Sequence, residues 1–173
     1  VCVHVLPLPF VLFSISWFLA NVSEPTAFSD TVARGLMFTT SFFYNVLLFR
    51  ALSKPGGFLS LHFGWQDATL QTLRRQLDRL AFVGVPLLFA TVLLFLSDVE
   101  SDRATLGRLA FVGFMLFLSS VIRPFLHPDT GLAAGFYKRN AGRWSARLRW
   151  VWFGLGVGLP LLLGVVSMLG FLY

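Results

Sequence analysis

The stretch that decides the fold is Arg143–Tyr173, RWSARLRWVWFGLGVGLPLLLGVVSMLGFLY. Arginines and tryptophans stand at its start, and no charged residue follows from Trp150 to Tyr173. About 20 apolar residues, each rising about 1.5 Å, cover the roughly 30 Å hydrocarbon core of a bilayer, so residues 150–173 are predicted to span a membrane. Because arginines mark cytoplasmic helix ends and indoles favour the headgroup layer, we expect lipid headgroup contacts from Arg143, Trp144, Arg147, Arg149, Trp150 and Trp152.

The composition extends this interpretation to the whole chain. Of the 173 residues 56% are hydrophobic and 13% are charged, whereas soluble domains carry about 25% charged residues. The formal net charge of +6 would suggest nucleic acid binding if the basic residues formed one soluble surface, but they fall in two loops and so indicate membrane topology instead. Cys2 is the single cysteine, which excludes an intrachain disulfide and a cysteine metal cluster. Because the chain begins at Val1 rather than at a methionine, we expect it to be a fragment of a longer protein.

Apolar segments and loop charges together predict an all-α, polytopic membrane protein with about five transmembrane helices in a single module, 1–173. The expected spans are 3–22, 31–52, 80–97, 104–122 and 150–173. The connections over 50–79 and 123–149 carry net charges of +3 and +5, whereas 23–30 and 97–103 each carry −2. Basic loops stay in the cytoplasm, so the N-terminus is expected to be cytoplasmic and the C-terminus periplasmic.

The segment 67–79 has the pattern of an amphipathic helix. Leu70, Leu73 and Leu77 recur at helical spacing, and the positions between them include Arg74, Arg75 and Arg79. Two interpretations are open: a soluble extension of the next span, or an interfacial helix whose arginines contact anionic lipid headgroups.

Five residues inside the spans are candidates for helix packing or kinking. Asn45 is expected to hydrogen-bond across a helix interface, because an amide in lipid needs a partner; a transport role is the alternative. Prolines inside helices favour kinks, which predicts them at Pro86 and Pro160. Gly154 and Gly158 form a GxxxG pattern, typical of close helix packing.

A hexamer, RLAFVG, occurs at 79–84 and again at 108–113. It is either a chance similarity in an apolar chain or the trace of an inverted repeat of the transporter kind. Catalytic chemistry is not indicated. His4, His62 and His127 lie far apart, with no carboxylate or thiol at ligand spacing, and no catalytic motif occurs. We therefore predict no enzyme activity, no cofactor and no metal site.

The C-terminal stretch also resembles a known family. The order Trp144, Arg147, Leu148, Arg149, Trp152, Pro160, Leu161, Gly170 and Tyr173 is similar to the inner-membrane segment of the large mechanosensitive channels of the MscS superfamily, the MscK and MscM type. The basic turn with Arg123, Pro124, Asp129 and Gly131 resembles the same segment. The resemblance implies a multi-pass protein of the bacterial inner membrane, a homo-oligomer (a heptamer in that family), and a pore-forming module in the same subunit but outside these residues.

Residues and resemblance together give one leading hypothesis for function. These helices would be the peripheral part of a mechanosensitive channel, coupling bilayer tension to a pore outside this chain and protecting the cell against hypoosmotic shock. The expected partners are membrane lipids and the pore module, and no nucleic acid. The alternatives are a fragment of a secondary transporter, or a passive membrane anchor or assembly domain.

Overall fold

The structure is a computed structural model that describes residues 7–22, 26–54, 56–63, 67–96, 103–128, 131, 144 and 148–169. Over these residues the chain forms helices and no strands, which confirms the predicted all-α class. The elements are α1 (Pro7–Ala20), α2 (Ala27–Leu52), α3 (Phe58–Phe63), α4 (Asp67–Arg79), η2 (Leu80–Gly84), α5 (Val85–Leu96), η3 (Arg103–Gly107), α7 (Arg108–Leu126) and α10 (Arg149–Met168). The two η elements are π-helical turns.

Four helical runs are long and apolar enough to cross a membrane: Ala27–Leu52, Asp67–Leu96, Thr105–Leu126 and Arg149–Met168. The first helix, α1, is also apolar but has 14 residues, a length of about 21 Å at about 1.5 Å per residue. The described residues therefore contain four helices of spanning length and one shorter apolar helix.

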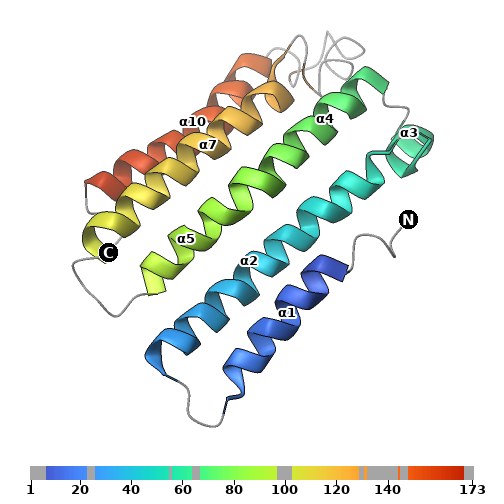
Figure 1. Cartoon of the computed structure of the whole chain (residues 1–173). Helices are drawn as coiled ribbons and strands as arrows, with labels where there is room; N and C mark the ends of the chain where they lie inside the picture. The colour runs from blue at the N-terminus through green and yellow to red at the C-terminus, as the bar shows by residue number, and fades with distance from the viewer. Residues whose placement is uncertain are drawn as a thin grey trace.

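The helices stand side by side in a row, in the order α1, α2, α4–α5, α7 and α10, and each runs antiparallel to the next (Figure 1). Packing is most extensive within the two outer pairs, α1 with α2 and α7 with α10. A buried serine links each outer pair: Ser16 Oγ donates to Ala33 O at 2.7 Å, and Ser119 Oγ donates to Val157 O at 3.0 Å. Such hydrogen bonds and close packing hold membrane helices together, because lipid tails are as apolar as leucine.

The hydrophobic core lies where α2, α4 and α7 meet. Its buried members are Val46, Leu73, Leu77, Leu80 and Val121. The leucine face expected for 67–79 is thus the face that α4 turns toward its neighbours, and Leu70, the first leucine of that face, is fully buried. Nearer the start of α2, Gly35 lets α5 come close, since a Cβ on this residue would lie 3.1 Å from the Leu93 side chain.

Pro86 lies inside the continuous helical run Asp67–Leu96, two residues after the end of the π-helical turn η2. In this turn the Val85 N–H donates to Leu80 O, one residue farther back than in an α-helix. A proline lacks an N–H and its ring clashes with the carbonyl four residues before it, so a wider turn before Pro86 accommodates both defects. The run remains continuous through the proline.

Candidate membrane-lipid interface

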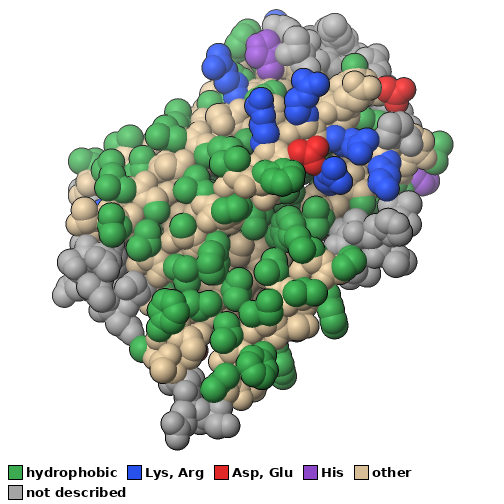
Figure 2. All heavy atoms as spheres, viewed as in Figure 1, with side chains coloured by type: hydrophobic (Ala, Val, Ile, Leu, Met, Phe, Trp, Pro, Cys, Tyr) green, Lys and Arg blue, Asp and Glu red, His purple; other side chains and the backbone are tan. Residues whose placement is uncertain are grey.

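Basic side chains from four neighbouring helices lie together at one end of the helix axes. Because neighbouring helices are antiparallel, the end of α2, the start of α4, the end of α7 and the start of α10 coincide there. Figure 2 shows lysine and arginine side chains gathered at this end and hydrophobic side chains over the rest of the same face. We call this set the basic end; its described members are Arg50, Lys54, Arg74, Arg75, Arg79, Arg123 and Arg149.

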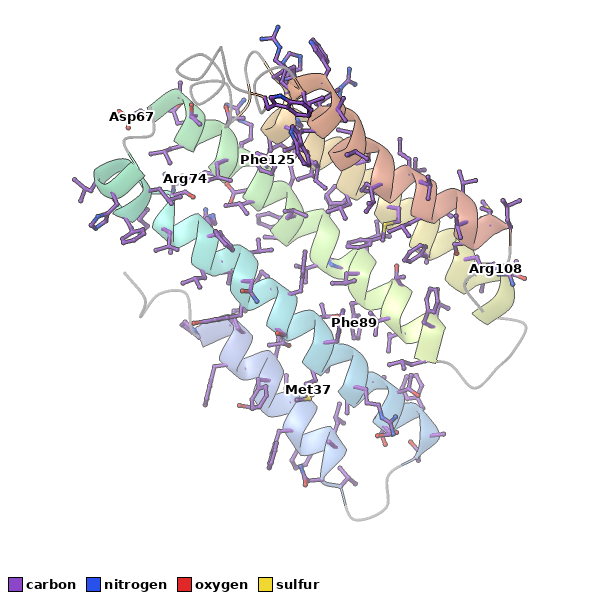
Figure 3. The ribbon with its side chains drawn as sticks, turned by 180° about the vertical axis from the view of Figure 1, so that it is seen from behind. Met37, Asp67, Arg74, Phe89, Arg108 and Phe125 are labelled. Carbon is purple, nitrogen blue, oxygen red and sulfur yellow. The ribbon has the colours of Figure 1, made fainter. Side chains whose placement is uncertain are left out.

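Three of these arginines lie on α4, Arg74 beside the buried leucines and Arg75 and Arg79 away from them. Arg75 and Arg79 are exposed and Arg74 is half-buried. In Figure 3, Arg74 and Asp67 lie at one end of the helix axes and Arg108 lies at the other end. Because α4 runs into η2 and α5 and lies in line with α5, the arrangement favours the extension of a span over a helix lying flat on the membrane.

One ion pair ties the basic end together. Arg50 Nε on α2 donates to Asp78 Oδ1 on α4, and each side chain is 42% exposed. The structure shows no such pair for Arg74, Arg75, Arg79 or Arg123 among the residues it describes. Their guanidinium groups can therefore hydrogen-bond anionic oxygens from outside the protein, such as those of phosphate.

Aromatic rings border the arginines at the start of α10. His127, which follows α7, contacts Trp150 and Phe153 edge to face, with ring centroids 6.3 and 5.8 Å apart. Trp144, Trp150 and Trp152 are exposed. Amphipathic rings beside arginines are typical of a membrane–water interface. Arg143 and Arg147, predicted for the same layer, lie outside the described residues.

The comparison with known families agrees with this geometry. The family described as mechanosensitive ion channel inner membrane domain 1 matches residues 1–173. The chain belongs to this family. No curated protein and no solved structure matches the chain at a significant level. The match confirms the resemblance to the inner-membrane segment of the MscS superfamily. The chain is thus the membrane part of a mechanosensitive channel, and the family to which it belongs is not an enzyme family.

In α10 the glycine that lies close to a neighbouring helix is not one of the two that the GxxxG pattern predicts. A Cβ on Gly154 or Gly158 would meet nothing within 4 Å, whereas one on Gly156 would lie 2.0 Å from Leu126 Cδ1. The close approach of α7 and α10 therefore occurs at Gly156, which the GxxxG pattern skips. Among the described residues no neighbouring helix packs closely at Gly154 or Gly158, so helix packing through this GxxxG pattern stays a prediction.

Asn45 makes its described hydrogen bond inside its own helix. Its Nδ2 donates to Ser41 O at 2.8 Å, and the side chain is exposed. The expected bond across a helix interface is therefore not made within the described chain. Of the two predicted kink sites, Pro86 is exposed and Pro160 is buried in α10. The predicted kinks at these prolines stay predictions.

A second feature of the domain is an apolar hollow at the opposite end of the α7–α10 pair. Its volume is about 280 Å³, and its lining includes Val112, Met115, Leu161 and Val165. Within the part of the chain that the structure describes, no group of three or more His, Cys, Asp or Glu side chains lies close enough to hold a metal ion.

Proposed function

We propose that this channel domain couples bilayer tension to a pore outside the chain, in the inner membrane of a bacterium, and so helps protect the cell against hypoosmotic shock. The observation that carries the proposal is the basic end, where four helices bring basic side chains to one level beside exposed indoles. Among the described residues, Arg74, Arg75 and Arg79 of α4 and Arg123 of α7 have no ion pair there. Each basic residue near an anionic membrane surface contributes about 1 kcal/mol of attraction. Lipid headgroups can therefore hold this end while tension acts on the apolar rest.

The row arrangement supports the same function. A single row of helices leaves broad apolar faces for lipid, and Figure 2 displays one of them. Helix contacts in this row are made mainly between neighbouring helices. We propose that the row deforms when the bilayer thins and widens, because neighbouring helices in a single row can shift against one another.

Orientation and assembly complete the proposal. The basic end would face the cytoplasm under the positive-inside rule, which places the N-terminus inside and the C-terminus in the periplasm. Arg143 and Arg147 would join the same interface. The family resemblance supports a homo-oligomer, a heptamer in that family, in which each subunit has its own pore-forming module.

Neutralising α4 tests the proposal in the full-length channel. In liposomes, the Arg74→Gln, Arg75→Gln, Arg79→Gln triple variant should lose the difference in gating tension between anionic and zwitterionic lipid that the unmodified channel shows, because about 3 kcal/mol of surface attraction is removed. Patch recording at defined tension measures the threshold.

Arg34→Gln is the control, since Arg34 is exposed at the opposite end of α2, where it pairs with Asp30 at 2.6 Å. It should leave the lipid dependence unchanged. If the triple variant keeps the full difference in gating tension between anionic and zwitterionic lipid, the lipid-holding role is excluded. Retention of the whole tension response after deletion of the domain would instead indicate a passive anchor.

A further inference from the structure

The exposed face of α2 carries polar side chains at a depth where lipid is expected. Ser41 and Asn45, one turn apart, are exposed on this helix between Arg34 and Arg50. The two arginines are about 24 Å apart along the axis at about 1.5 Å per residue, which is less than the roughly 30 Å hydrocarbon layer, so the residues between them lie inside that layer.

The amide of Asn45 keeps unused hydrogen-bonding capacity. Its Nδ2 donates to Ser41 O at 2.8 Å, which leaves a second N–H on Nδ2 and both lone pairs of Oδ1 without a partner among the described residues. The Ser41 hydroxyl likewise has no partner in the part of the chain that the structure describes. Because hydrocarbon satisfies no polar group, an asparagine at this depth requires a partner from another protein surface.

A second exposed face lies on α7. Gly113, Leu116 and Ser120 follow one another at intervals of three and four residues, which places them on one side of the helix. Leu116 is 55% exposed, and a Cβ on Gly113 would meet nothing within 4 Å. Ser120 is exposed and donates to Phe117 O at 2.6 Å, while its oxygen remains able to accept a hydrogen bond. This face therefore offers a polar acceptor beside an open glycine.

The two faces lie at the same depth. Arg50 of α2 lies beside Asp78 of α4, and a Cβ on Gly84 of η2 would lie 3.0 Å from Phe117 of α7. Counted from these contacts along the antiparallel helices, the amide of α2 and the exposed hydroxyl of α7 are level to within about one helical turn, about 5 Å. Both α2 and α7 end at the basic end, so they run in the same direction (Figure 1).

The two faces point to opposite sides of the row. Each residue turns about 100° around a helix axis. From Ala33, which contacts α1, the turn along α2 reaches the exposed face after about 100° and Gly35, which contacts α5, after about 200°. From Phe117, which contacts η2, the turn along α7 reaches Ser119, which contacts α10, after about 200° and the exposed face only after about 290°. The opposite order on two parallel helices places the faces on opposite sides.

We propose that the exposed face of α2 in one copy of the chain packs against the exposed face of α7 in the next copy. Each copy then offers a different face to each of two neighbours, and such heterologous contacts close into a ring when the rotation between copies closes. The second N–H of Asn45 Nδ2 donates to Ser120 Oγ, and Gly113 leaves room for the helices to approach closely. This contact rests on the proposed homo-oligomer and adds the surfaces through which its copies meet.

Cysteine cross-linking in native membranes tests the contact in the full-length protein. With the native cysteines replaced by serine, Cys2 included, Ser41→Cys is combined with Leu116→Cys, which lies at about the same depth on α7. Each copy then carries both halves of the contact, and a disulfide needs Cα atoms within about 7 Å. Iodine oxidation should therefore yield a ladder of covalent dimers, trimers and larger species, whereas each single variant should remain monomeric.

The matched control replaces Leu116→Cys with Leu162→Cys. Leu162 is 61% exposed, and Gly164, two residues later, lies against Met115 of α7. The control cysteine is therefore exposed at about the depth of Leu116 but lies on α10. The ladder from Ser41→Cys with Leu116→Cys should exceed the ladder from the control pair several-fold.

Two variants added to the Ser41→Cys, Leu116→Cys pair test the polar contact. Asn45→Leu and Ser120→Ala should each lower the yield of cross-linked species about threefold, the factor expected for one typical interhelical hydrogen bond in a membrane. Because both remove the same bond, the two together should lower the yield no more than either alone. Unchanged yields, or losses that multiply, would overturn the proposal.

Native mass spectrometry of the purified channel separates the failure of this contact from the failure of the proposed function. Equal ladders from the two cysteine pairs, or covalent dimers from Ser41→Cys alone, in a channel that is still a homo-oligomer would overturn the contact and leave the proposed function standing. A single copy in the mass spectrum would overturn the contact together with the proposed homo-oligomer.

Discussion

At 79–84 the hexamer RLAFVG ends α4 with its arginine and forms the π-helical turn η2 with the other five residues, whereas at 108–113 the same six residues begin the α-helix α7. Burial differs as well. Leu80 is 9% exposed, whereas its counterpart Leu109 is 53% exposed. A Cβ on Gly84 would lie 3.0 Å from Phe117, whereas one on Gly113 would meet nothing within 4 Å.

The difference comes from the residues around each hexamer. Pro86 follows the first copy at the position that Met115 takes after the second, and only the proline removes an N–H from the helix ladder. The first copy also lies between α2 and α7. The second copy lies toward the end of the helix axes that is opposite the basic end. A duplicated unit would be expected to keep its helix type and its buried face, so the contrast favours chance similarity over an inverted repeat.

Truncating the leucines should give the largest contrast between the copies. Leu80→Ala removes side-chain atoms from the cluster with Val46, Leu77 and Val121 and should lower the free energy of unfolding by about 2 to 4 kcal/mol through the cavity it leaves. Leu109→Ala should lower it by less than about 0.5 kcal/mol. Reversible SDS unfolding of the purified domain in mixed micelles measures both. Equal losses would show that the burial difference has no energetic consequence.

Alanine at the glycines should give a smaller contrast, with opposite signs. Gly84→Ala brings a Cβ against Phe117 and Leu80 and should destabilise by about 1 kcal/mol, near the low end for an overpacked core. Gly113→Ala meets open space and should stabilise by about 0.5 to 1 kcal/mol, because alanine is the better helix former. The same unfolding assay compares the two, and stabilisation by Gly84→Ala would contradict the close approach of α7 to η2.

The ion pair beside the first copy should give the smallest effect. Asp78 precedes that hexamer and pairs with Arg50, whereas Gly107 precedes the second. Both paired side chains are 42% exposed, so a double-mutant cycle with Arg50→Gln and Asp78→Asn should give a coupling of about 0.5 to 1 kcal/mol that weakens with salt. A coupling that is independent of salt would indicate a more buried pair than the structure contains.

Local patterns predicted some of these features and missed others. The spacing of leucines in α4 identified its buried face, because the positions between the leucines are polar. Polar side chains stay in contact with water, and leucine side chains are buried against neighbouring helices. The glycine pattern of α10 did not identify Gly156, since its contact with Leu126 depends on where α7 ends. Neither the hydrogen bond of Asn45 to its own helix nor the π-helical turn before Pro86 was expected.

The sequence by itself determined the all-helical class, the apolar segments and the basic loops. The reason is that a bilayer requires every backbone polar group to form its hydrogen bond within its own helix. Charged residues are excluded from the hydrocarbon layer, and basic residues therefore gather in the loops that stay in the cytoplasm. Only the tertiary structure decided which face of each spanning helix meets protein. Lipid tails and leucine side chains are equally apolar, so hydrophobic periodicity does not distinguish a lipid contact from a helix contact. Gly156 against Leu126, Ser119 against Val157 and the exposed polar face of α2 therefore became apparent only in the assembled row.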